Sequence, residues 1–191
     1  MRLIFCLLCP SPLLIAHASG AVVDVAVPRA AAPLDRIFYH AQGIATEIYA
    51  RIGVQLRWRR PGTREPERSN GLMHCTILLA FSWNTPSDSH PGALAFANPS
   101  TVGGDAATVF MDRLKPLADH NPIGCAFLLG HVLAHEIGHV LQGIIRHSAT
   151  GVLKEHWSEL EIRRMQVERL RFTDYDAALI RDGIRSRTGR K

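Results

Sequence analysis

One stretch constrains the fold of this chain more than any other: FLLGHVLAHEIGHVL, residues 127–141. It lies in a predicted helix from about Gly124 to Gln142, which Gly143 can end by adopting a left-handed conformation. The stretch is apolar nearly all round, and a helix of this kind is buried. Its charged and imidazole side chains would therefore be costly without partners, by several kcal/mol. The chain must build a domain around this helix and must supply those partners.

The rest of the chain predicts strands and helices that can cover the long helix. Patterns of β-branched, alternating or continuous apolar residues predict strands at 21–27, 54–60, 73–81, 93–97 and 107–111. Helical periodicity and capping signals predict helices at 33–52, at 158–171 and from 173 onward. This order predicts a single α/β or α+β domain, in which the long helix packs on a mostly parallel sheet and further helices follow. A length of 191 residues suits one domain.

The first 18 residues have the pattern of an export signal. A positive Arg2 precedes an apolar stretch, and the small residues at 16–18 predict cleavage after Ala18. The domain would then occupy residues 19–191, and the protein would act in the periplasm or the medium. An uncleaved anchor or a buried first helix is the alternative. After removal of the signal we expect no membrane-spanning segment.

Charge and cysteine content limit the classes of partner. The net charge of +5 is mild, and the basic residues near the end of the chain have no supporting nucleic-acid motif, so we expect no nucleic-acid partner. The predicted mature protein keeps Cys75 and Cys125. In an exported protein these two either form a disulfide or remain as buried free thiols, and the sequence does not decide between them.

The residues HEIGH carry the chemistry of the predicted site. His135 and His139 are four residues apart, so their imidazoles project from one face of a helix and can bind one ion. Glu136 lies beside the first ligand and can act as a general base. In this H-E-x-x-H arrangement the expected ion is one catalytic Zn²⁺, and the expected chemistry is hydrolysis by a zinc-activated water.

A catalytic zinc ion needs a third protein ligand. His147 is the first choice, because Gly143 lets the chain turn back beneath the helix before it reaches this histidine. Glu155 and Glu159 are the alternatives, since a carboxylate from the next segment would also close the site. His131 precedes His135 by one turn on the same stripe. Three ligands along one straight helix fit a tetrahedron poorly, so we expect His131 to pack or to support a ligand.

At these residues the chain resembles the metzincins, zinc peptidases with the motif H-E-x-x-H-x-x-G-x-x-H followed by a methionine turn. The resemblance rests on His135, Glu136, His139, Gly143 and His147, and on the turn at 148–153. It implies a metzincin-like fold and the ligand set His135, His139 and His147. It also implies that the short strand at 93–97 is an antiparallel edge strand, which pairs with an extended peptide or protein substrate.

The chain departs from the metzincin pattern in spacing and in the turn. The glycine falls one residue later than in the family motif and the third histidine two residues later. Val152 and Leu153 stand where the family has its methionine turn, and Leu153 can supply an apolar floor beneath the metal. These departures indicate a divergent branch, similar to uncharacterised exported bacterial proteins.

The sequence thus predicts a secreted zinc-dependent metalloendopeptidase with Glu136 as general base. Two alternatives stay open. One is an exported zinc hydrolase with a glutamate as third ligand, similar to the gluzincins. The other is a non-catalytic zinc-containing binding module.

Overall fold

The computed structural model describes residues 21–28, 35–60, 74–88, 91–99 and 105–188. The predicted signal at 1–18 lies outside these residues. The elements in chain order are β1 (Ala21–Ala26), α1 (Asp35–Ala50), β2 (Val54–Arg59), β3 (His74–Ser82), β4 (Ala95–Asn98), β5 (Ala106–Phe110), α2 (Met111–His120), α3 (Pro122–Gln142), α4 (Glu159–Arg164) and α5 (Asp174–Thr188).

The strands form one mixed sheet in the order β2-β1-β3-β5-β4. Neighbouring strands run parallel from β2 to β5, whereas β4 pairs antiparallel with β5, with Ala97 opposite Ala107. The predicted α/β class and the mostly parallel sheet are confirmed, and so is an antiparallel edge strand. Since β4 ends the sheet, one of its edges has no strand partner among the described residues.

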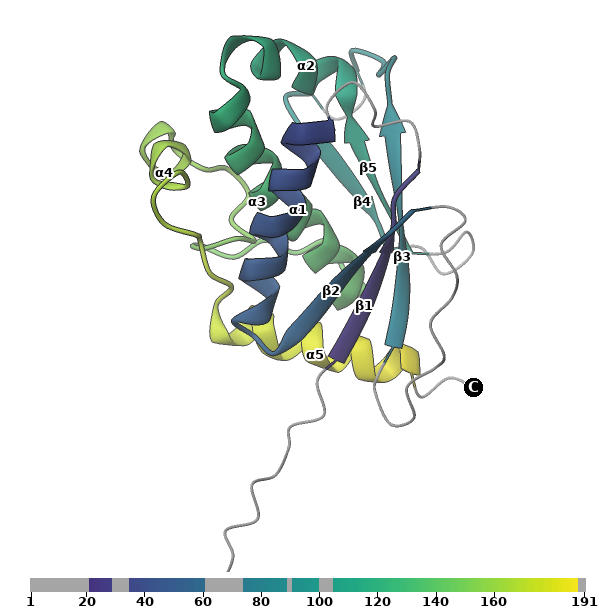
Figure 1. Ribbon diagram of the computed structural model, residues 1–191. Helices are drawn as coiled ribbons and strands as arrows, with labels where there is room; N and C mark the ends of the chain where they lie inside the picture. Colours follow the sequence, from purple (N-terminus) through teal and green to yellow (C-terminus); the bar gives the residue numbers. More distant parts are fainter. Residues whose placement is uncertain (1–20, 29–34, 61–73, 89–90, 100–104, 189–191) are drawn as a thin grey trace, which may run out of the picture.

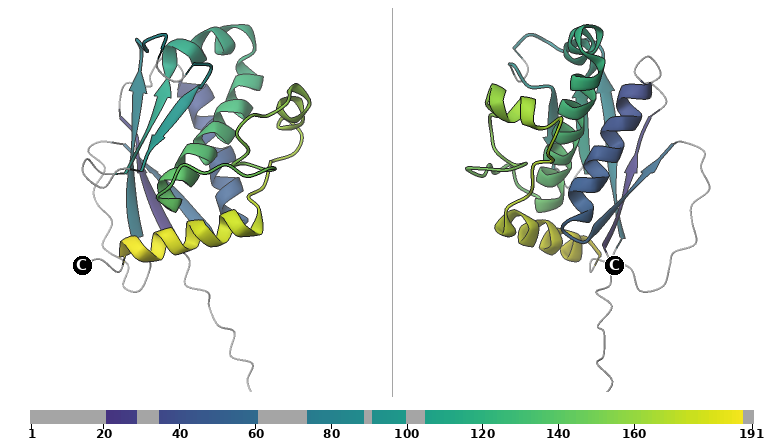
Figure 2. Two further views of the ribbon diagram at one scale, coloured as in Figure 1. Left: turned by 180° about the vertical axis from the view of Figure 1, so that it is seen from behind. Right: turned by 60° about the vertical axis from the view of Figure 1, so that its left-hand side comes forward.

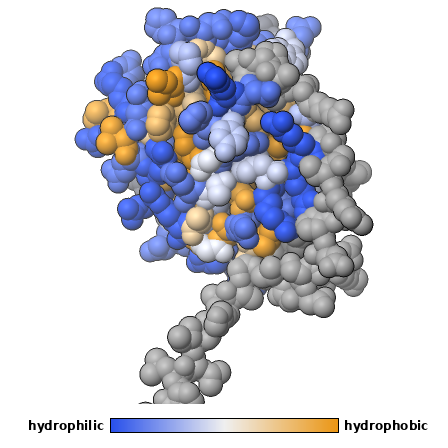
Figure 3. Space-filling view, viewed as in Figure 1, coloured by the Kyte–Doolittle hydropathy of each residue, from blue (hydrophilic) through white to orange (hydrophobic). Residues whose placement is uncertain are grey.

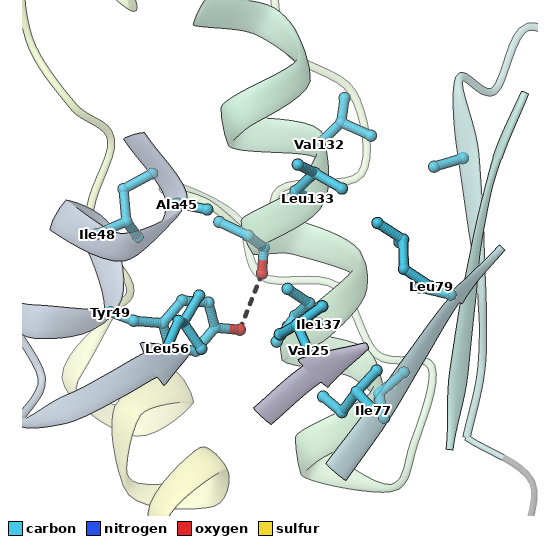
Figure 4. Close-up of a cluster of buried hydrophobic side chains, with 14 of the residues drawn as sticks. Val25, Ala45, Ile48, Tyr49, Leu56, Ile77, Leu79, Val132, Leu133 and Ile137 are labelled. Carbon is cyan, nitrogen blue, oxygen red and sulfur yellow. Dashed lines mark hydrogen bonds between the residues drawn. The ribbon is translucent and has the colours of Figure 1, made fainter. Parts of the chain in front are cut away.

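Helices α1 and α3 pack side by side on one face of the sheet, and α5 runs across one end of the sheet and of α3 (Figures 1 and 2). The core between these layers is continuous. Figure 4 shows side chains of α1, α3 and the central strands meeting there. Tyr49 of α1 adds a polar link, because its hydroxyl donates to the Ala134 carbonyl at 3.0 Å. The long helix is therefore fixed on its sheet side and on its α1 side.

Local sequence signals set both ends of α3. The Asn121 side chain accepts a hydrogen bond from the Gly124 backbone N–H at 2.9 Å, and Pro122 occupies the first turn. At the other end Gly143 has φ of 72°, the left-handed conformation expected from the sequence. By length and composition alone α3 is also the one described helix apolar enough to cross a membrane, but 72% of its apolar window is buried inside the domain.

Two helices differ from the sequence prediction. No helix was predicted at 111–120, where Pro116 argues against one, yet α2 forms there. Its apolar stripe of Met111, Leu114 and Ala118 is buried, and this burial outweighs the proline. Conversely, the helix predicted at 158–171 is only six residues long. Its capping box is as expected, but the chain passes into turns after Arg164.

The two described cysteines are free thiols. Cys75 lies in β3 and Cys125 in the first turn of α3, and both are buried. Burial raises the pKa of Cys75 to about 12 and that of Cys125 to about 11. Of the two alternatives that the sequence left open, the structure has the buried thiols.

Candidate metal centre

Three histidines that the sequence singled out come together in space. Helix α3 places His135 and His139 one turn apart, and their Nε2 atoms are 2.9 Å from each other. The ring of His147, from the segment after α3, lies 5.3 Å from the His135 ring and 5.0 Å from the His139 ring. One nitrogen of each histidine lies within 4.8 Å of those of the other two, so the cluster could hold a metal ion.

The segment after α3 brings His147 back to the helix through a short closed turn. The Ser148 backbone N–H donates to the Leu153 carbonyl at 2.7 Å, and the backbones of Ser148 and Lys154 form an isolated β-bridge. The turn is also bonded to α3, because His135 Nδ1 donates to the Val152 carbonyl at 2.8 Å. The turn that carries His147 is thus bonded to one of the other two histidines.

Two glycines allow this turn to approach its neighbours. At Gly138 a β-carbon would come within 3.0 Å of the Leu153 side chain, so Leu153 packs directly on the helix between the two histidines. Gly151 has φ of 81°, and a β-carbon there would lie 2.3 Å from the Arg171 carbonyl oxygen. Val152 and Leu153 are fully buried. The turn therefore presents apolar side chains, as its sequence predicts for the place of the methionine turn.

The histidines of α3 are held in the neutral form that metal ligands require. Burial lowers the pKa of His135 to about 4, and it lowers the pKa of His139 to about 3 with help from the other two histidines. Because His135 donates through Nδ1, its Nε2 carries the lone pair, and this atom faces His139 Nε2 at 2.9 Å. A backbone carbonyl that orients the distal nitrogen is a common support for a histidine ligand.

Glu136 is a residue of α3 whose carboxyl group contacts the edge strand β4. Burial raises the pKa of its carboxyl group to about 7, and a hydrogen bond from the Ala97 backbone partly offsets this rise. Ala97 belongs to β4, which packs against α3. The carboxyl group thus lies against the edge strand, on the residue that follows His135 in α3, with a pKa near neutrality.

Among the nearby histidines, His131 has a different role. Its Nδ1 donates to the Phe127 carbonyl at 2.8 Å, and its Nε2 accepts from the Leu170 N–H at 3.2 Å. Both ring nitrogens are therefore used within the protein, and His131 joins α3 to the segment before α5. These bonds give His131 a structural role within the domain, in line with the packing role that was one of the two expected for it.

The structure also adds a residue that the sequence analysis did not identify. The Trp157 ring lies 5.7 Å from the His135 ring and 6.4 Å from the His131 ring, and its Nε1 donates to the Gly151 carbonyl at 3.1 Å. Trp157 thus covers one side of the cluster and bonds to its turn. No motif in the sequence marks this role; an aromatic residue soon after the predicted ligands is the only signal.

The alternative carboxylate ligands lie elsewhere. The side chains of Glu155 and Glu159 are 64% and 87% exposed. Glu155 is 3.9 Å from His156, and Glu159 pairs with Arg163 at 3.4 Å. Neither belongs to the histidine cluster. Of the three candidates for the third ligand, the structure brings only His147 to His135 and His139.

Two other surface features are separate from the cluster. A groove of about 820 Å³ runs between α1 and the first turns of α3, with Trp58, Ile123 and Phe127 among its lining residues and none of the three histidines. Hydrophobic side chains also gather on the surface over α4 (Figure 3), where Leu160 is 52% and Val167 90% exposed. We assign no ligand to either feature.

The cluster fits a metal ion by its donor chemistry. Two neutral, buried imidazoles direct Nε2 atoms at one point, and a third imidazole closes the group, which is a donor set typical of zinc and other divalent transition metals. Comparison with models of known protein families gives no match, and comparison with curated protein sequences gives none either. The assignment of this site therefore rests on its geometry and chemistry.

Proposed function

We propose that this chain is an exported zinc-dependent endopeptidase of metzincin-like design. The observation that carries the proposal is the convergence of His135, His139 and His147, together with the half-buried Glu136, which adjoins His135 on α3. Three protein ligands leave zinc a position for water or substrate. A zinc ion bound there would supply Lewis acidity toward a peptide carbonyl and lower the pKa of water.

Residues of the chain would bind the metal and transfer the proton. His135, His139 and His147 would hold the metal. The Glu136 carboxylate would take a proton from the attacking water and give it to the leaving amine nitrogen. A pKa near 7 suits both halves of this transfer at neutral pH. The hydrogen bond from Ala97 holds the carboxylate against α3 and β4.

The edge strand β4 is the proposed docking place for the substrate. It lies beside Glu136, and its outer edge has no strand partner among the described residues. An extended peptide can add to such an edge through backbone hydrogen bonds. This binding mode does not require a particular side-chain sequence, so we propose peptides or proteins as the substrate class and propose no cleavage preference.

Substitution of Glu136 tests the reaction. Glu136→Gln keeps the size of the side chain but removes the base, so we expect it to bind zinc like the unmodified protein and to lose at least about 100-fold in cleavage rate. Cleavage of a mixed peptide library is the activity assay, with inhibition by a chelator and restoration by Zn²⁺. Bound zinc is measured by elemental analysis.

A matched control is Glu159→Gln, which changes an exposed glutamate outside the cluster and should leave both zinc content and cleavage unchanged. Undiminished turnover by Glu136→Gln would refute the proposed base. Zinc binding without any cleavage by the unmodified protein would favour the non-catalytic binding module.

A further inference from the structure

A buried carboxylate from a different element holds the two neighbours of His147. Asp176 of α5 is fully buried. Its Oδ1 accepts a hydrogen bond from Ser148 Oγ at 2.7 Å and forms an ion pair with the Arg146 guanidinium. Arg146 also donates to Ser148 Oγ and to the His147 carbonyl, both at 3.1 Å. The residues on either side of His147 are therefore bound to one oxygen atom.

The second oxygen of Asp176 fixes the direction of the carboxylate. Oδ2 accepts from Thr173 Oγ1 at 2.7 Å and from the Thr173 backbone N–H at 3.3 Å. In return, the Asp176 backbone N–H donates to Thr173 Oγ1 at 3.1 Å. This reciprocal cap begins α5. Because one oxygen is held by the cap, the other is directed at Arg146 and Ser148.

Helix α5 is itself docked tightly on α3, which carries the other two histidines. A β-carbon at Gly183 would lie 1.7 Å from the Leu141 carbonyl oxygen, so the two backbones are in direct contact. Arg187 donates to that same carbonyl at 2.7 Å, and Ile180 is fully buried. The position of Asp176 relative to α3 is thus determined by backbone contact and by packing.

From these contacts we propose that Asp176 is a positioning residue for the metal centre. Through Arg146 and Ser148 it holds His147 at the place where its imidazole can share an ion with His135 and His139. Asp176 is not itself a member of the ligand cluster, so its effect on the metal is exerted through His147. This inference rests on the proposed function, because it assumes that the three histidines bind zinc.

Zinc affinity is the property that this role controls. We expect Asp176→Asn to weaken Zn²⁺ binding by about 10-fold to 100-fold, as is typical when a residue that orients a ligand is lost. The measurement is a Zn²⁺ titration of the full-length protein against a competing chromophoric chelator. Asp182→Asn is the matched control: it makes the same charge change on the same helix at an exposed residue that pairs with Arg185, and it should leave zinc affinity unchanged.

A double-mutant cycle separates positioning from a general effect on folding. In a His147→Ala background Asp176 has no ligand to position, so adding Asp176→Asn should weaken zinc binding no further. Equal loss in both backgrounds would overturn the inference. Ser148→Ala removes one hydrogen bond to Asp176 and leaves the ion pair with Arg146, so it tests the same role if Asp176→Asn does not fold. It should weaken zinc binding measurably, by up to about tenfold, and undiminished affinity in this variant would also overturn the inference.

The same titrations distinguish failure of this inference from failure of the proposed site. If His147→Ala binds Zn²⁺ as tightly as the unmodified protein, the three-histidine site is wrong and the role of Asp176 is wrong with it. If His147→Ala weakens binding but Asp176→Asn does not, only the inference is wrong.

Discussion

His131 and His135 stand one turn apart on the same helix, and the difference between them lies in their hydrogen bonds. Both ring nitrogens of His131 are bonded to backbone groups, whereas His135 donates to a backbone carbonyl through Nδ1 and faces His139 through Nε2. The spacing of HEIGH was enough to predict that His135 and His139 share a face. The partners of His131 could not be predicted in detail, because Leu170 is 39 residues away in the sequence.

The burial of His131 predicts an acid-sensitive contribution to stability. Burial lowers its pKa from 6.5 to about 4. As the pH falls, the imidazole of His131 is therefore protonated in the unfolded chain before it is protonated in the folded protein. Its contribution to stability is present above pH 6.5 and is lost as the pH falls through 4. In urea unfolding of zinc-free protein, we expect His131→Gln to be less stable than the unmodified protein at pH 7. The difference in unfolding free energy between the two proteins should be smaller by about 2–3 kcal/mol at pH 4.5.

The other buried histidines titrate in both proteins, so the comparison isolates His131. An equal gap at the two pH values would contradict the prediction.

At the scale of elements, the conformation of the turn at 148–153 depends on Gly151. Gly151→Ala would place a β-carbon 2.3 Å from the Arg171 carbonyl oxygen in a backbone with φ of 81°. We expect a loss of stability well above the ~1–2 kcal/mol of left-handed strain alone, together with weaker zinc binding. Gly53→Ala is the control, since φ there is 74° and a β-carbon would meet nothing within 4 Å.

Denaturant unfolding of both variants measures the difference. Equal losses of stability would show that the contact with Arg171 is unimportant.

The elements also show what local patterns can predict. The strands and the two long core helices follow hydrophobic periodicity, and the bounds of β2 and β3 differ from the predicted ranges by one residue. Helix α2 was missed because Pro116 opposes it locally, while burial of Leu114 against the rest of the domain supports it. Helix α4 was predicted too long because its capping box marks where a helix begins and not where it ends.

At the scale of the whole molecule, the part of the chain that the structure describes is stabilised by packing and contains no covalent cross-link. Cys75 and Cys125 are buried in the core, with thiol pKa values of about 12 and 11. We expect the melting temperature to be the same with and without a reducing agent, because the described part of the chain has no disulfide to break. Thermal unfolding followed by circular dichroism checks this, and a lower melting temperature in reductant would contradict it.

The contact between Asp176 and Ser148 has a consequence for biosynthesis. A ribosome adds residues from the amino end, so all three histidines are made before the carboxylate that anchors the turn. A nascent chain that ends before α5 would already contain His135, His139 and His147. It would lack the Asp176 carboxylate, which binds Arg146 and Ser148. On the proposed role of Asp176, the site would therefore gain its full zinc affinity only after helix α5 has been synthesised and has docked on α3.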